Sequence, residues 1–306
     1  MAGWRVWYTS VMFFTMVTHE VSYGEAIVMD MAPNAVDDSY STCRDKMLTK
    51  ILAKDGILQE ELKANSEFKS AWNSTSHCSP VFPGGQPQHV QAFQAFGNDE
   101  VFSKTFNEAV KTKGGDVSIY TDQFKFKSLH FLLMDAMRIL NNGSQCKTVY
   151  SGIFDDFVVE KGHRVRFGEF FSVSASKSYA EEGCVDEGTL FRIDTCSVVD
   201  LTKHACHPEH TTMLLSPVEV FNVVDVTTGK SDCAKEIALA SSGFISDHNC
   251  YLFPMMPTTS APATATARST SSTTAQSAKG SSTQGVDPRG LVLLTIVFHF
   301  FLILSL

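Results

Sequence analysis

The stretch Arg166-Phe-Gly-Glu-Phe-Phe-Ser-Val-Ser174 belongs to a series of four short motifs in this chain of 306 residues. Two motifs precede it, namely Gln123-Phe-Lys-Phe-Lys-Ser-Leu-His-Phe-Leu-Leu133 and Val149-Tyr-Ser-Gly152. One motif follows it, Pro208-Glu-His-Thr-Thr-Met-Leu-Leu-Ser-Pro217. The apolar pattern changes from a helical to a strand period along the series. The motifs therefore span two kinds of predicted structure.

The part of the chain before the second motif is predicted to be helical. From about residue 41 to 110, apolar side chains recur near a 3.6-residue period. Asp122 is a predicted N-cap for a helix over 123–140, which ends at the Asn-Asn-Gly sequence that follows. On this helix we expect His130 to pack in the core and to take no part in catalysis.

The part after Cys146 is predicted to form strands. Its apolar runs are short, rich in β-branched and aromatic residues, and broken by Gly, Asp and Pro. Helices followed by strands predict an α+β fold, in which a β-sandwich has its helices gathered at one side. The predicted strands cover residues 148–150, 164–167, 189–193, 212–215 and 218–226.

In their order and spacing the four motifs resemble the vertebrate ecto-ADP-ribosyltransferases. Enzymes of this family are NAD(P)+–protein-arginine ADP-ribosyltransferases, which move ADP-ribose from NAD to arginine side chains of proteins outside the cell. The resemblance covers about residues 28–252. It implies the ADP-ribosyltransferase fold, with an N-terminal helical part, a C-terminal pair of packed sheets and an NAD cleft between strands. NAD would be the substrate, and no metal would be needed.

The reaction of this family sets clear chemical demands. Cleavage of the nicotinamide–ribose bond passes through a transition state with oxocarbenium character, as in glycoside hydrolysis. The site needs a carboxylate near the ribose, polar groups for the carboxamide, and a cation or backbone donors for the pyrophosphate. In the family an Arg-Gly pair, a Ser on a later strand and a Glu-x-Glu turn supply these groups.

Three of these positions differ in this chain. Ser151 stands in place of the arginine, although Gly152 is kept, and a neutral hydroxyl cannot clamp a phosphate as a guanidinium does. His210 and Thr212 stand in place of the two glutamates, the second of which is catalytic. Losing one preorganised electrostatic group costs about 10²–10³ in rate. We therefore expect transferase activity to be absent or severely weakened.

Four further residues are candidates for the cleft. Ser172 occupies the family's serine position, where either a ligand contact or a purely structural role is open. Glu169 stands where the family commonly has an NAD-contacting glutamine, and its charge would repel a dinucleotide unless protonated or turned away. Phe96 replaces a tyrosine of an early NAD contact. Glu209 precedes Thr212 by three residues and becomes a substitute carboxylate if a local bulge turns it into the cleft; the alternative is a solvated turn residue.

The ends of the chain predict its compartment. Residues 1–24 contain one early arginine, an apolar run and small residues, which is typical of a secretory signal peptide. A folded unit over 25–253 is followed by a Ser/Thr-rich stalk over 254–284. The apolar tail within 285–306 indicates attachment of a GPI lipid, with a tail-anchored membrane segment as the alternative. These features predict a GPI-anchored protein on the extracellular face of the plasma membrane.

The eight cysteines and two sequons agree with a secreted chain. An even number of cysteines suggests disulfides, whose pairing the spacing alone leaves open. The family resemblance implies Cys43–Cys250 and Cys146–Cys196, and it leaves four cysteines unassigned. Asn73 and Asn142 begin glycosylation sequons. The unassigned cysteines are Cys78, Cys184, Cys206 and Cys233.

Charge and composition narrow the class of partner. The net charge is −8 with no long basic cluster, so nucleic acid is not an expected partner. Three hypotheses remain: a surface protein that no longer transfers ADP-ribose and acts by binding a partner, a weak arginine-directed transferase or NAD glycohydrolase that uses Glu209, and a paralogue without a ligand. The candidate partners are NAD(P) and an extracellular or cell-surface protein.

Overall fold

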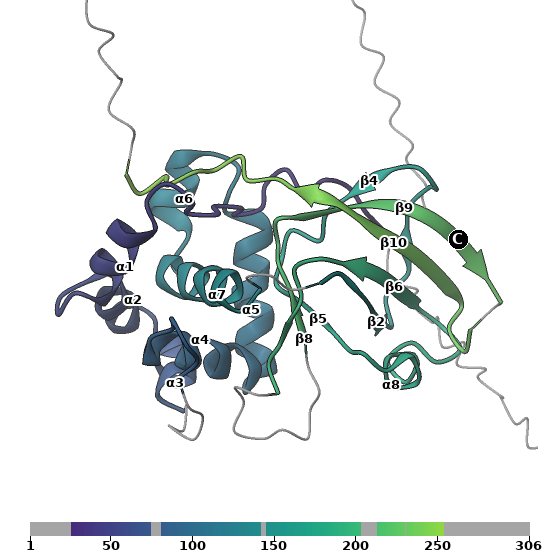
Figure 1. Ribbon diagram of the computed structural model, residues 1–306, viewed down its shortest axis with the longest axis horizontal. Coiled ribbons are helices and arrows are strands. Elements are labelled where there is room, and N and C mark those ends of the chain that lie inside the picture. Colours follow the sequence, from purple (N-terminus) through teal and green to yellow (C-terminus); the bar gives the residue numbers. More distant parts are fainter. Residues whose placement is uncertain (1–25, 75–80, 142–144, 203–212, 230, 254–306) are drawn as a thin grey trace, which may run out of the picture. The chain divides into compact units, whose positions relative to one another are not determined.

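The computed structural model describes residues 26–74, 81–141, 145–202, 213–229 and 231–253. These residues belong to one compact unit (Figure 1). None of the helices in these ranges is both long and apolar enough to span a bilayer. The predicted signal peptide, stalk and lipid-attachment tail lie outside the described residues, as do Asn142, Cys78 and Cys206.

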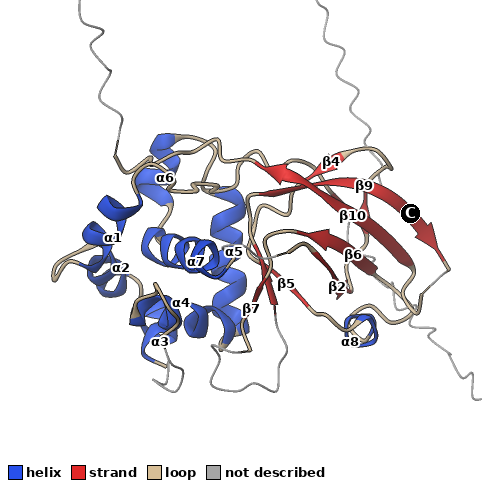
Figure 2. Cartoon of the chain, viewed as in Figure 1, coloured by secondary structure: helices blue, strands red, loops and turns tan. Residues whose placement is uncertain are grey.

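Apart from one short helix, the helices gather at one side of this unit and the long strands at the other, as Figure 2 shows. The predicted α+β class is therefore confirmed. Within the described ranges, seven helices precede the first long strand, and a short eighth helix lies among the strands. The helices are α1 (Arg44–Leu52), α2 (Ile57–Ala64), α3 (Ser66–Asn73), α4 (Pro87–Gly97), α5 (Glu100–Thr112), α6 (Val117–Gln123), α7 (Lys127–Leu140) and α8 (Lys177–Glu181).

Helix α7 is the centre of the helical part, since every residue from Lys127 to Met137 is buried. The predicted helix over 123–140 was wrong in its beginning, because Asp122 and Gln123 are the last residues of α6. Helix α7 lacks a side-chain cap from its own N-cap residue. Instead the Glu61 carboxylate of α2 accepts hydrogen bonds from the backbone N–H of Lys127 (2.8 Å) and of Ser128 (2.9 Å). A cap supplied from a distant helix leaves no local signal in the sequence.

The strands form three sheets. A five-stranded sheet has the order β2-β6-β10-β9-β4, a three-stranded sheet the order β5-β8-β7, and β1 pairs with β3. Side chains from the two larger sheets, among them Phe171 of β5 and Phe191 of β6, share one core. The strands are β1 (Ile27–Val28), β2 (Lys147–Ile153), β3 (Phe157–Val158), β4 (Arg164–Val165), β5 (Phe171–Val173), β6 (Thr189–Thr195), β7 (Val199–Asp200), β8 (Met213–Leu215), β9 (Glu219–Thr228) and β10 (Lys235–Phe244).

Four predicted strands overlap β2, β6, β8 and β9, but two expectations need correction. The run over 164–167 is a strand only at Arg164–Val165, because the chain turns at Gly168, which has a φ of +66°. Strand β10 was not predicted, although it lies between β6 and β9 in the centre of the large sheet. Its second half contains alanine, serine and glycine and has no β-branched residue. Pairing with β9 continues to Phe244, whereas pairing with β6 ends at Ala240.

Three disulfides join distant segments of the described chain. Cys43–Cys250 and Cys146–Cys196, the bridges that the resemblance implied, are both present, with Cα–Cα distances of 6.0 and 4.1 Å. The third, Cys184–Cys233, joins the segment after α8 to the segment before β10. It resolves one of the pairings that the sequence left open.

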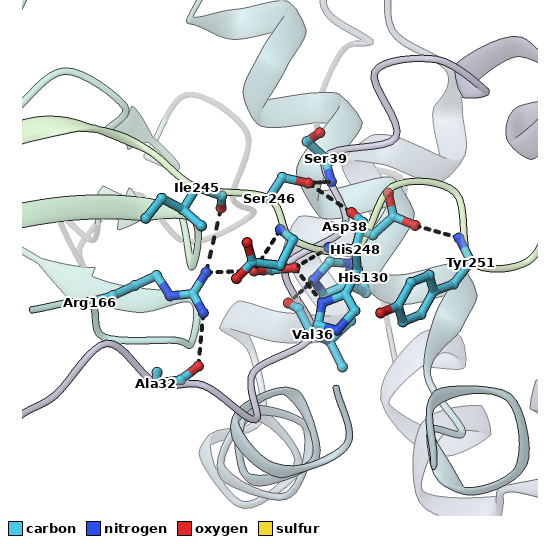
Figure 3. A network of polar contacts seen from close by, with 12 residues as sticks. Ala32, Val36, Asp38, Ser39, His130, Arg166, Ile245, Ser246, His248 and Tyr251 are labelled. Atoms are coloured by element: carbon cyan, nitrogen blue, oxygen red, sulfur yellow. Dashed lines mark hydrogen bonds and ion pairs between the residues drawn. The ribbon is translucent and has the colours of Figure 1, made fainter. Parts of the chain in front are cut away.

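A buried polar cluster ties both ends of the unit to the third motif (Figure 3). Asp37 accepts hydrogen bonds from the Arg166 guanidinium (2.7 Å), from the backbone N–H of His248 (2.9 Å) and from its imidazole. Hydrogen bonds from His248 and Arg166 outweigh the effect of burial and lower the pKa of Asp37 to about 2. The carboxylate therefore stays charged and holds the two segments at neutral pH.

His130 lies beside this cluster (Figure 3) and is fully buried, as expected. Its Nε2 is 3.0 Å from the carbonyl of Val36, and its Nδ1 is 2.8 Å from the Tyr40 hydroxyl. Burial lowers the pKa of His130 to about 4, so the imidazole is neutral. A carbonyl only accepts, so Nε2 donates to Val36 and Nδ1 accepts from Tyr40. This histidine is part of the core.

Glu61 makes the stability of the protein depend on pH. Burial raises its pKa to about 7 from an ordinary 4.5, despite the hydrogen bonds from Ser128 and Lys127 that oppose the shift. Between about pH 4.5 and pH 7 the folded state keeps a proton on Glu61 that the unfolded chain releases. Proton binding therefore stabilises the folded state at low pH, and this contribution is lost as the pH rises through 7. From pH 5 to pH 8 we expect the unfolding free energy of the parent protein to fall on the order of 2 to 3 kcal/mol because of Glu61. In Glu61→Gln this contribution to the fall should be absent.

Chemical denaturation across this pH range measures the effect. The exposed neighbour Glu60 provides the control, since Glu60→Gln should leave the slope of the parent protein intact. An unchanged slope in Glu61→Gln would contradict the assignment.

Candidate functional site

Two pockets with shared walls contain the five predicted cleft residues that the structure describes. The first, of about 390 Å³, is lined by Ser151 and Gly152 of β2, by Ser172 of β5 and by residues of α8. The second, of about 650 Å³, is lined by Ser151 and Ser172 again, together with Phe96 of α4 and Glu169. The same two serines line both pockets, so the pockets adjoin and are together called the cleft. Glu209, His210 and Thr212 lie outside the described residues.

The backbone between the two sheets sets the positions of the two serines. Tyr150 and Ser174 exchange backbone hydrogen bonds of 2.8 and 2.7 Å, which join β2 of the large sheet to the end of β5. Along β5, Phe171 and Val173 are buried whereas Ser172 is exposed, as the two-residue period of a strand requires. Ser172 and Ser151 therefore both face the cleft.

Gly152 is required for packing next to the cleft. A Cβ atom at this position would lie 1.9 Å from the backbone oxygen of Ala180 in α8 and 2.7 Å from Sγ of Cys184. No side chain fits in that space without moving the helix backbone. The glycine that the motif retains thus has a structural reason independent of any ligand.

Phe96 forms an aromatic wall of the cleft. Its side chain is buried, and its ring centroid lies 6.0 Å from that of Phe106 in α5 and 6.2 Å from that of Phe170. Asn107 of α5 holds this wall in place, because its amide donates to the Phe170 carbonyl (2.9 Å) and accepts from the Phe170 N–H (3.2 Å). This part of the cleft is apolar and firmly packed.

Glu169 lines the second pocket and pairs with Lys111 of α5, with 3.6 Å between Oε2 and Nζ. Burial raises the pKa of this carboxyl, and the Lys111 charge opposes that shift. The carboxyl is therefore not turned away from the cleft, and its charge is partly balanced by the neighbouring lysine. A third pocket of about 380 Å³ shares Lys111, Glu169 and Ile153 with the second.

The sequence analysis missed the contribution of α5 to this site. Polar residues recur on α5 every three or four positions from Glu100 to Lys111 and line the second pocket. The opposite face, with Phe102, Phe106 and Val110, is buried. The helical period of these residues is visible in the sequence, but it does not tell which polar face borders a cleft. In the described residues no cluster of three or more His, Cys, Asp or Glu suits a metal ion.

Comparison with known proteins identifies the family. A family model described as NAD:arginine ADP-ribosyltransferase matches residues 29–247. The chain belongs to this family. It is 30% identical over 236 residues to NAD(P)(+)--arginine ADP-ribosyltransferase 2 of Gallus gallus, with 74% of this chain and 73% of that protein covered. It is 34% identical over 204 residues to T-cell ecto-ADP-ribosyltransferase 1 of Rattus norvegicus, with coverage of 65% and 72%.

A third relative and two solved structures agree with this family. GPI-linked NAD(P)(+)--arginine ADP-ribosyltransferase 1 of Mus musculus is 28% identical over 246 residues, with 74% of each chain covered. The crystal structure of the eukaryotic mono-ADP-ribosyltransferase ART2.2 matches with a TM-score of 0.61 and 32% identity, over 73% of this chain and 98% of that one. A variant of ART2.2 in complex with NAD gives 0.59 and 31% over the same shares. The expected ADP-ribosyltransferase fold is confirmed.

The close approach at Gly152 leads to a stability prediction. We expect Gly152→Ala to destabilise the protein by about 1–3 kcal/mol, because the added methyl group meets the Ala180 carbonyl. Urea unfolding measures the change. Gly97→Ala is the matched control, since a Cβ at the end of α4 has open space within 4 Å and should not destabilise the fold. Equal stability of Gly152→Ala and the parent protein would rule out the packing role.

Proposed function

We propose that this protein is a cell-surface member of the arginine ADP-ribosyltransferase family whose transferase activity is lost or severely weakened, and that it acts by binding. The observation that carries the proposal is the position of Ser151, which lines both pockets of the cleft. The family motif has an arginine there, and a serine hydroxyl supplies neither its charge nor its paired donors. Thr212 at the catalytic glutamate position supplies no charge for an oxocarbenium-like transition state.

The cleft itself supports a ligand-binding role. It keeps the exposed Ser172, the aromatic wall at Phe96 and the close contact at Gly152. One solved relative is a complex with NAD, which makes NAD or NADP the proposed ligand of this chain. The second proposed partner is an extracellular or cell-surface protein.

The proposed location is the extracellular face of the plasma membrane. Relatives carry the words ecto and GPI-linked in their names. The signal-like residues 1–24, the stalk over 254–284 and the apolar tail within 285–306 support the same location for this chain. Asn73 is exposed at the end of α3, where a glycan would be accessible.

NAD turnover tests the proposal. The full chain is glycosylated and purified from expressing vertebrate cells, and nicotinamide release is measured with and without an arginine-like acceptor. We expect its rate to be lower than that of Ser151→Arg/Thr212→Glu by a factor of at least about 10²–10³. The double variant restores the two charges that the family reaction uses. If it binds no NAD, Glu169 and Phe96 must also be incompatible with the ligand.

The alternative, an active arginine transferase or an NAD glycohydrolase that uses Glu209, makes the opposite prediction. Turnover by the parent protein that Glu209→Ala abolishes would make Glu209 the substitute carboxylate and would refute the loss of activity. A melting curve shows that each variant is folded.

A further inference from the structure

Helix α5 presents a charged face to the cleft. Its apolar residues Phe102, Phe106 and Val110 point into the helical core. Its polar face lines the second pocket together with Ser151 and Ser172. This face consists of Glu100, Ser103, Lys104, Asn107, Glu108 and Lys111.

Lys111 lies where the second and third pockets meet, because it lines both of them together with Glu169. Its Nζ is 3.6 Å from the Glu169 carboxylate and 4.0 Å from that of Glu108. The side chain is 41% exposed, whereas that of Glu169 is 20% exposed. A ligand in the cleft can therefore reach the ammonium group of Lys111, while the less exposed Glu169 carboxylate pairs with the same group.

The other cations that line the described pockets are less suited to a ligand. Arg166 borders the third pocket, but its guanidinium already donates to Asp37 and to the carbonyls of Met31 and Ala32. Lys104 is 76% exposed and pairs with Glu100 at 2.7 Å. Such an exposed, solvated lysine gains little from a new partner. Lys111 remains as the partly buried cation of the cleft.

We propose that Lys111 is the phosphate-binding cation of this cleft, and that Glu169 competes with the phosphate for it and so sets the affinity for an anionic nucleotide. The inference rests on the proposed function, because it assumes that the cleft binds a nucleotide. With serine at position 151, the positive charge for the phosphate comes from α5. Bound phosphate takes the place of the Glu169 carboxylate on the Lys111 ammonium.

The exchange accounts for two features of the cleft, namely the largely buried carboxylate of Glu169 and its ion pair with Lys111. In the free protein the Lys111 ammonium balances the Glu169 carboxylate, which would otherwise be an unpaired charge in the pocket wall. The same carboxylate reduces the charge of Lys111 that is free to attract a ligand. The affinity of the cleft for phosphate groups is therefore held low by a residue of the protein itself.

Binding of ADP-ribose to the full-length protein tests the proposal by calorimetry. We expect Glu169→Gln to tighten binding on the order of tenfold, ~1.4 kcal/mol, and Lys111→Met to weaken it by a similar factor. Lys111→Arg keeps the cation and should keep most of the affinity. The gain from Glu169→Gln should vanish in the Lys111→Met background, because the carboxylate acts through the lysine.

Three results would overturn the proposal. The first is a gain from Glu169→Gln that persists without Lys111, since the carboxylate would then repel the ligand directly. The second is an equal gain from Glu100→Gln, the matched carboxylate on the same face. The third is the absence of ADP-ribose binding in both the parent protein and Glu169→Gln, with melting curves that show both to be folded.

The readout separates this inference from the proposed loss of catalysis. ADP-ribose carries no nicotinamide bond to cleave, so its binding does not depend on turnover. Nicotinamide release by the parent protein would refute the proposed loss of activity and leave the role of Lys111 to the binding data.

Discussion

The buried contact between Asp37 and Arg166 is the constraint on which the site depends. Both side chains are almost completely removed from solvent, so neither charge can lose its partner without leaving an unpaired ion in the core, a loss of about 3–5 kcal/mol. His248 joins the same carboxylate, and Cys43–Cys250 closes the chain nearby in sequence. The contact fixes the start of the third motif, whose later residues Glu169 and Ser172 line the cleft.

The turn after Arg166 transmits this constraint to the cleft. Gly168 has a φ of +66°, and a Cβ there would lie 2.4 Å from the Cβ of Ala32, so only glycine fits. Phe167 and Phe171 then stack with 3.9 Å between ring centroids. The residues that hold the cleft are thus different from Ser151, His210 and Thr212, the positions at which the proposal places the lost reactive groups. Such a separation lets the fold persist under the proposed loss of activity.

Sequence reasoning succeeded where the signal is local and failed where it is not. The overlap of the predicted strands with β2, β6 and β9 follows from dense β-branched and aromatic runs. The start of α7 was misplaced because its cap, Glu61, comes from another helix. Strand β10 was missed because its second half has no β-branched residue and is held by pairing with β9, a contact between separate strands. The role of Lys111 was missed because the helical period of α5 does not show that its polar face borders a pocket.

The amino-acid sequence by itself determined the family and the α+β class, because motif order and residue identity are properties of the chain. Only the tertiary structure decided that Ser151 and Ser172 share a cleft, that Gly152 is needed against α8, and that Glu169 meets Lys111. These are contacts between residues far apart in the chain. They depend on how the two sheets and α5 pack, which no local pattern encodes.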